Sequence, residues 1–444
     1  MRFRVILSRL LTGIVLLVRS AAPAAKPQVD TFTLENGIRV ILLYISDSNN
    51  VSVFTFLPMG LVDDAPGQAQ WSHLVEHLTI RTTVPSGSLE ANGETLPDHM
   101  RLDFYGTVKN WQEAISHHAK WLKGIPFTKE NLRTEKLQVN SECDFVAKRQ
   151  ATHKFAMAAW AQGYRHGQEH AAIKEDINIA TLGQIQQYRD KHLFVPNETV
   201  VCVVGGIDAK TLKPVISKQL GTITSEATMA EQVSLHPGSR KMTWDLNARH
   251  LVLTWPIPAI SDMSYPSIMA VGPWLMMKLS AEPELKKLSG MIFAGTDLVT
   301  PEGNFFYVSA SIKPDVSFDD VRKRIESQLR ILSSETSALT EVSLLGPQLS
   351  YQLTNLPDPK LAKAQAPPNI SYAMIEGNIG LQWAMHDFRY GRFRSLLAQR
   401  LKNVSGEKVR QAVIKYLKAE KCSVYCIEPK EEIMKSDAAY QPKR

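Results

Sequence analysis

The chain has 444 residues, of which 44% are hydrophobic and 21% are charged, an ordinary globular composition with room for two or three domains. The formal net charge is +7, but four of the 51 lysines and arginines lie in the first 25 residues, which contain no acid. The remaining 47 basic and 44 acidic residues leave a charge of +3, which argues against a nucleic-acid-binding protein.

Residues 1–25 have the pattern of a secretory signal peptide. A positive start, Met1–Arg4, precedes an apolar run, Leu10–Val18, and a small-residue cleavage region, Ala21–Ala25. The apolar run is too short to span a bilayer stably. Because the leader is also rich in arginine and free of acid, a mitochondrial presequence is the alternative. We therefore expect a periplasmic or secreted protein, with the mitochondrial matrix as the alternative compartment, and no stable membrane span.

The stretch after the leader predicts three strands. Asn36-Gly37 is a strong turn signal between strands at 32–34 and 38–43. A third strand is expected at 51–57, and the segment Asp63–Gly67 then breaks the chain.

Residues 71–78 predict a helix with two different faces. His73, Glu76 and His77 lie on one face, opposite an apolar stripe at helical spacing. Two imidazoles four residues apart can share one ion, and neutral imidazole nitrogen suits zinc. A carboxylate beside them can take a proton from a zinc-bound water. This H-x-x-E-H order is the inverted zincin motif. The apolar stripe consists of Trp71, Leu74, Val75 and Leu78.

The same order of residue types occurs a second time, at His166–His170. This copy contains Gly167 and lacks an apolar stripe. Because glycine inside a helix costs about 1 kcal/mol relative to alanine, we interpret this copy as a loop. The metal site is therefore assigned to the first copy.

Three further helices are predicted in the first half of the chain. An amphipathic helix covers Trp111–Lys123, and we expect its His117 and His118 to be surface residues. A long helix is predicted over Glu130–Gln162 and another over Ile177–His192.

Two acids on the long helix share one face. Glu135 and Glu142 are seven residues apart, which is two helical turns. After the helices, a turn at 194–199 leads into an apolar run at 200–204 that predicts a buried strand ending in glycines.

Beyond a polar linker at 229–240, the order of strand and helix recurs without the histidines. This weak repeat predicts a duplicated α+β unit. The expected elements are strand 250–255, helix 265–279, strand 305–312, helix 319–334, a helical segment 397–417 and strand 422–427.

The third strand, the acidic loop with its glycine and the H-x-x-E-H helix together resemble the pitrilysin/insulinase-type inverted-zincin metallopeptidases. Pro196-Asn197 followed by Val203-Val204-Gly205 is similar to the run that closes the first domain's sheet in that family. The chain looks closest to the short two-domain branch of mitochondrial processing peptidase subunits and bacterial processing-peptidase-like zinc proteases.

The resemblance implies an α+β fold of two similar domains. Each would be an antiparallel or mixed sheet with helices packed on one face, and the two would form half of a clamshell. The implied divisions are a signal peptide or presequence at 1–25, a metal-binding peptidase domain at 26–228, a linker at 229–240 and a homologous domain without a metal site at 241–444.

The resemblance also implies roles for individual residues. His73, His77 and Glu142 would bind one Zn²⁺ per chain, and Glu76 would be the general base on zinc-bound water. Glu135 would support the catalytic site from behind. The separation from His77 to Glu142 is 65 positions, about ten fewer than is usual in the family.

Two stretches depart from the family pattern. The family's substrate-binding arginine and tyrosine, seven residues apart, correspond to Lys286 and Phe293, which lack the planar guanidinium and the hydroxyl. Asn92–Thr95 only loosely resembles the family's substrate-binding strand, and its Asn-Gly is as easily a plain turn.

The resulting function prediction is a zinc metalloendopeptidase that hydrolyses unstructured peptides enclosed in a chamber. A second chain would close the chamber, as a homodimer or as a heterodimer with a similar subunit. The alternative is a low-activity or inactive peptidase-like subunit that serves structure or substrate holding. A metal-binding protein without hydrolysis is the third hypothesis, and Glu76 argues against it because a storage site needs no base.

Overall fold

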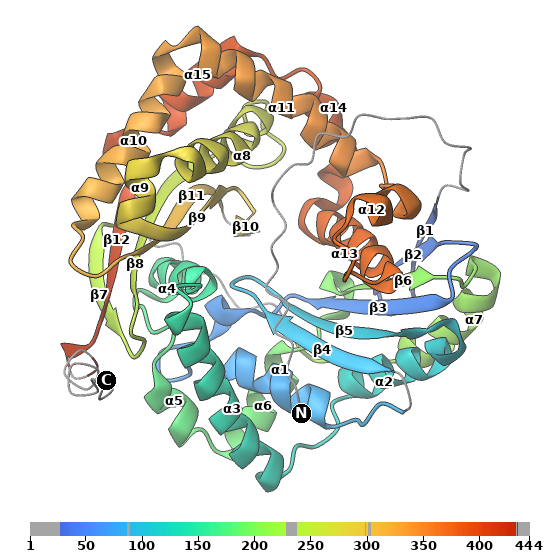
Figure 1. The fold of residues 1–444 in the computed structure, drawn as a ribbon. Coiled ribbons are helices and arrows are strands. Elements are labelled where there is room, and N and C mark those ends of the chain that lie inside the picture. Colours follow the sequence, from blue (N-terminus) through green and yellow to red (C-terminus); the bar gives the residue numbers. More distant parts are fainter. Residues whose placement is uncertain are drawn as a thin grey trace.

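The computed structural model describes residues 27–86, 89–227, 238–297, 299–300, 303–431 and 433. The predicted signal peptide at 1–25 lies outside these ranges, as does most of the predicted linker at 229–240, so both stay predictions. The chain forms two halves, each built on one β-sheet (Figure 1). Within the described ranges, no helix has the length and apolar character needed to cross a membrane.

Among the described residues, the first sheet is mixed and has six strands. The predicted hairpin at Asn36-Gly37 is confirmed, since β1 and β2 pair antiparallel on either side of it. The C-terminal strand β6 of this half lies between β2, to which it is parallel, and β3, to which it is antiparallel. From one edge to the other the strands are β1 (Gln28–Thr33), β2 (Arg39–Tyr44), β6 (Val200–Gly205), β3 (Asn50–Leu57), β5 (Met100–Thr107) and β4 (Glu90–Thr95).

The second sheet repeats this arrangement. Its C-terminal strand β12 is parallel to β7 and antiparallel to β8, as β6 is to β2 and β3. The duplicated α+β unit is thereby confirmed as a shared topology. The strands, in order, are β10 (Val299–Thr300), β11 (Gly303–Ile312), β8 (Arg249–Ile257), β12 (Ser423–Pro429) and β7 (Arg240–Trp244), with β9 (Ser289–Gly295) also paired to β11.

Helices pack mainly on one face of each sheet. Those of the first half are α1 (Trp71–Arg81), α2 (Trp111–Lys123), α3 (Lys129–Lys148), α4 (His153–His166), α5 (Lys174–Ile179), α6 (Leu182–His192) and α7 (Ala209–Leu220). Those of the second half are α8 (Tyr265–Ala281), α9 (Pro283–Leu288), α10 (Phe318–Ser334), α11 (Thr336–Thr354), α12 (Pro359–Gln365), α13 (Tyr372–Tyr390), α14 (Arg394–Leu401) and α15 (Gly406–Tyr416).

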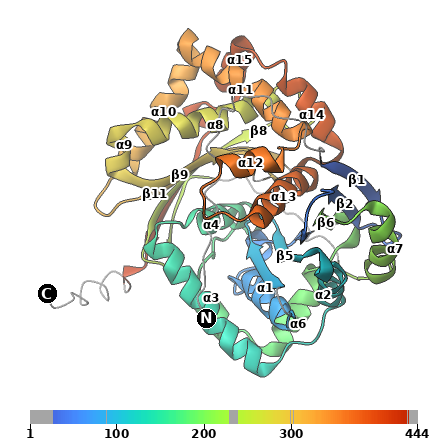
Figure 2. The ribbon, with the colours of Figure 1, turned by 45° about the vertical axis from the view of Figure 1, so that its right-hand side comes forward.

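One helix of each half packs on the sheet of the other half. In Figure 1 and Figure 2, α13 of the second half lies against the first sheet, and α4 of the first half lies beside the second. Ile375 and Ile379 of α13 join one buried cluster with alternate residues of β2, β3 and β6, while the intervening residues face the core beneath α1 and α2. Strand β6 is a continuous apolar run because both of its faces are covered.

Several sequence predictions were wrong in detail. The single helix over 130–162 is two helices, α3 and α4, separated by a turn in which Gln150 has a φ of 54°. The predicted helices at 177–192 and 397–417 are likewise each split in two. The helices between residues 336 and 390 were not predicted.

The prediction that His117 and His118 are surface residues was also wrong, because both are buried. His118 lies under the first sheet, where its Nδ1 is 2.7 Å from the hydroxyl of Thr55. Burial lowers the pKa of His118 to about 3, so it stays neutral at physiological pH.

Docking of α13 on the first sheet depends on a glycine. A Cβ on Gly380 would lie 2.0 Å from a methyl carbon of Val204, so no larger residue fits. We expect Gly380→Ala to lower the free energy of unfolding by about 1–3 kcal/mol through overpacking, measured by chemical denaturation. Gly183→Ala is the matched control, since its Cβ would meet nothing within 4 Å and alanine favours helix α6. Equal stability of the two variants would contradict the prediction.

Candidate metal centre

Helix α1 carries the H-x-x-E-H motif, and its start is fixed by a buried acid. The Asp64 carboxylate accepts the backbone N–H of Ser72 at 2.9 Å and the hydroxyl of Tyr188 at 2.7 Å. This satisfies one free N–H group in the first turn of α1 and fixes the helix against α6. The apolar stripe predicted from the sequence is buried, with Leu74, Val75 and Leu78 wholly covered.

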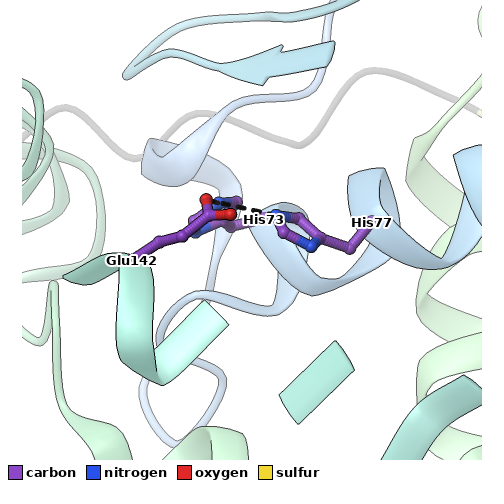
Figure 3. A group of neighbouring side chains, drawn as sticks. All are labelled: His73, His77 and Glu142. Carbon is purple, nitrogen blue, oxygen red and sulfur yellow. Dashed lines mark ion pairs between the residues drawn. The ribbon is translucent and has the colours of Figure 1, made fainter. Parts of the chain in front are cut away.

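His73, His77 and Glu142 come together from two helices. Figure 3 shows the carboxylate of Glu142, on α3, directed at the two imidazoles on α1. One Glu142 oxygen lies 3.6 Å from Nε2 of His73 and 3.4 Å from Nε2 of His77. The separation of 65 positions therefore suffices for the two helices to meet, because α1 packs directly on α3.

This donor set fits a divalent metal ion. The three ligand atoms lie within 4.8 Å of one another, and tetrahedral zinc with bonds of about 2.0–2.1 Å places its ligand atoms about 3.3 Å apart. The Nδ1 atom of each histidine makes a hydrogen bond outside the group of ligand atoms. Nδ1 of His73 lies 3.0 Å from the side-chain oxygen of Gln70, and Nδ1 of His77 lies 2.9 Å from the carboxylate of Glu135. Both Nε2 atoms are thereby oriented toward Glu142.

The two histidines differ in charge when no metal is bound. Burial lowers the pKa of His73 to about 4. Burial acts in the same direction on His77, but hydrogen bonds to Glu135 and Glu142 outweigh it and raise its pKa to about 10. Partial burial of Glu142 is likewise outweighed by the two histidines that face it, which hold its pKa well below the usual range. Glu142 is thus a carboxylate at all physiological pH values.

Glu76 lies beside this group and is buried. Its carboxylate accepts the Thr95 hydroxyl at 2.7 Å, and burial raises its pKa. It packs on Gly93, where a Cβ would lie 2.8 Å from a Glu76 oxygen. Residues 90–95 form strand β4 at the sheet edge, so the strand interpretation holds and the plain turn does not.

Three contacts around the centre were missed by the sequence analysis. The guanidinium of Arg81 donates to Glu135 at 2.7 Å, Thr95 bonds Glu76, and Gln70 bonds His73. Two of these residues could have been found from helical spacing. Gln70 lies three positions before His73 and Arg81 four positions after His77, so each shares a helix face with a ligand. Thr95 is distant in sequence and carried no such signal.

The structure places Lys286 and Phe293 in the second half. Lys286 is exposed on α9, and Phe293 on β9 stacks on the ring of His153 with centroids 4.3 Å apart. His73, His77 and Glu142 lie instead on α1 and α3 of the first half.

The second H-x-x-E-H copy is a loop, as interpreted. His166 ends α4, and Gly167 follows with a φ of 71°. Nε2 of His166 and Nε2 of His170 bond the backbone carbonyls of Val62 and Asp64. Their Nε2 atoms therefore serve the packing of the loop.

Residues 180–342 match the family model described as "Peptidase M16 inactive domain". The matched range covers the end of the first half and much of the second, and excludes the candidate metal ligands. No curated protein sequence matches the chain.

Solved structures share the fold across nearly the whole chain. A protease from Helicobacter pylori is 14% identical with a TM-score of 0.68, covering 91% of this chain and 100% of that one. A chain of complex III₂ from Candida albicans is 14% identical with a TM-score of 0.66, covering 90% and 96%.

A third similar structure is the periplasmic protease PqqL from Escherichia coli. Its first half is 14% identical with a TM-score of 0.59, covering 95% of this chain and 99% of that one. In whole PqqL the identity is 15%, the TM-score is 0.60, and the match covers 96% of this chain and 51% of that one. The predicted fold class, an α+β half-clamshell of two similar domains, is confirmed.

Proposed function

We propose that this chain is a zinc-dependent endopeptidase, with one Zn²⁺ per chain held by His73, His77 and Glu142. The observation that supports this most is the approach of three metal-ligand atoms to within 4.8 Å of one another. The chain's likeness to peptidase structures and the family match make peptide bonds the substrate to test first.

Glu76 is the proposed general base. A zinc ion supplies Lewis acidity, which lowers the pKa of a water molecule to about 7 and polarises a carbonyl. Glu76 accepts the proton of the attacking water and returns it to the leaving amine. Burial raises the pKa of Glu76. A carboxylate with a raised pKa is a stronger base, and a general base acts best when its pKa lies near the working pH. Glu135 accepts a hydrogen bond from Nδ1–H of His77 and so orients its Nε2 toward the metal position.

Extended peptides are the proposed substrates. Among the described strands, β4 pairs with β5 alone and ends the sheet, and an extended chain can add to such an edge through backbone hydrogen bonds. Gly93 and Thr95 on this strand touch Glu76, so a peptide paired with β4 would pass close to the base. Lys286 and Phe293 remain the proposed substrate-binding residues of the second half.

A second chain of similar fold is the proposed partner. The chain matches about half of PqqL, so two such chains, alike or different, would make a clamshell of that size. The likeness to a periplasmic protease supports export, with the mitochondrial matrix as the alternative.

A non-catalytic subunit is the second candidate function. Phe293 has no hydroxyl to stabilise an oxyanion, and loss of one such donor costs about 100-fold or more in rate. The test measures zinc content and peptide cleavage for wild type and Glu76→Gln, alone and with any co-purifying chain. Zinc-dependent cleavage that requires Glu76 supports the peptidase, whereas bound zinc without such cleavage supports the subunit.

The hydrogen bond from Thr95 gives a pH prediction. This hydrogen bond lowers the pKa of Glu76. Thr95→Val removes the bond, so the pKa of Glu76 should rise and a smaller fraction of Glu76 should be ionised at a given pH. We expect the acidic limb of the pH profile of kcat/KM to move to higher pH in Thr95→Val.

Thr79→Val is the matched control for this experiment. Thr79 lies on α1, and its buried hydroxyl has no hydrogen-bond partner among the described residues. An unchanged acidic limb in Thr95→Val, or an equal shift in Thr79→Val, would contradict the assignment.

A further inference from the structure

Gln70, the residue just before helix α1, has a backbone conformation that residues other than glycine rarely adopt. Its φ is 65° and its ψ is 14°, in the left-handed region that favours glycine. The backbone is held there on both sides, because Asp176 accepts the N–H of Ala69 at 2.9 Å and the indole N–H of Trp71 at 3.0 Å. A glycine would satisfy this turn with less strain.

The side chain of Gln70 is directed at the metal centre. It is buried, and its Oε1 lies 3.0 Å from Nδ1 of His73. The thiol of Cys143, the residue after Glu142, lies 3.8 Å from the same oxygen. Gln70 therefore connects the loop before one ligand to the helix that carries another.

The other end of the amide gives no folding advantage. Nε2 of Gln70 is buried and has no hydrogen-bond partner among the described residues. A strained backbone and an unpaired buried N–H both disfavour glutamine on stability grounds. Relative to glycine, glutamine adds the contact to His73 and the longer, weaker thiol contact from Cys143.

We propose that Gln70 is a positioning residue of the metal site, whose amide oxygen accepts a hydrogen bond from Nδ1–H of His73 and so keeps Nε2 unprotonated and aimed at the ion. In neutral imidazole one nitrogen carries the proton and the other accepts, so fixing the first defines the second. This inference rests on the zinc assignment proposed above.

Gln70→Gly tests the proposal because folding and metal binding should respond in opposite directions. The glycine relieves the backbone strain, so the metal-free variant should be at least as stable to heat as the wild type. Without the acceptor, zinc affinity should fall about 10- to 100-fold, measured by competition with a chromophoric chelator. Gln70→Glu keeps an acceptor oxygen and should bind zinc within a few-fold of wild type.

Gln68→Gly is the matched control. It replaces the same residue type two positions earlier in the chain, where φ is not in the left-handed region. It should leave zinc affinity unchanged. Nitrogen-15 NMR of the imidazoles without metal supplies a second readout: His73 should carry its proton on Nδ1 in wild type and lose that preference in Gln70→Gly.

Unchanged zinc affinity in Gln70→Gly, or a drop equal to that of Gln68→Gly, would overturn the inference while leaving the zinc site intact. A wild type that binds no zinc would instead overturn the proposed function. The protonation of His73 in the two metal-free proteins would then still decide whether Gln70 positions it.

Discussion

Glu76→Gln is expected to lower kcat for peptide cleavage by about 100- to 10,000-fold while zinc stays bound. The amide has the same shape but cannot accept a proton from water, and general acid–base catalysis contributes about that factor. The Thr95 hydroxyl can donate to the amide oxygen as it does to the carboxylate. Steady-state cleavage of a quenched fluorescent peptide and metal analysis of the same preparation make the measurement.

The control for this substitution is Glu198→Gln, which makes the same change at an exposed position. It should leave both cleavage and zinc content unchanged. Cleavage by Glu76→Gln at the wild-type rate would rule out Glu76 as the base. If the wild type and Glu76→Gln both bind zinc but cleave no peptide, the non-catalytic subunit is favoured.

Glu142→Gln should abolish tight zinc binding. The variant replaces an ionised ligand by a neutral amide, while Gln138, which donates to the present carboxylate at 2.9 Å, can still donate to the new side chain. We expect affinity to fall by more than the roughly 100-fold upper range seen for loss of an outer partner. Competition against a chromophoric chelator measures this.

Thermal stability offers an independent readout of the same substitution. Zinc at about 1,000 times its Kd would stabilise the wild type by about 4 kcal/mol, so the melting temperature should rise on zinc addition and scarcely change for Glu142→Gln. Glu130→Gln, an exposed position on the same helix, should respond like wild type. A zinc response retained in Glu142→Gln would mean that another group completes the site.

The pairing of residues along one helix could be predicted because it is local. The 100° advance per residue places His73 and His77 on one face and Leu74 and Val75 on the other, whatever the rest of the chain does. The same periodicity related Glu135 to Glu142, and the structure keeps them on one face, with the first against His77 and the second facing both histidines.

Residues whose surroundings come from distant segments were predicted less well. His118 follows the polar pattern of an exposed helix face, yet the first sheet covers it, and Thr55 from strand β3 bonds it. Helix α13 was not predicted, because the surface on which it packs comes from strands β6 and β3, far earlier in the chain; Gly380, for example, lies 178 positions after Cys202, whose thiol bonds its carbonyl.

Local residue patterns specify the ligand types, their helical faces and the alternation of strands and helices, since these depend on neighbours within a few residues. Three features follow instead from long-range packing: Glu142 meets the histidines across 65 positions, Gln70 contacts His73 from a left-handed turn, and each half has one helix packed on the sheet of the other. Such contacts follow from how whole helices and sheets pack, which no short stretch of sequence encodes.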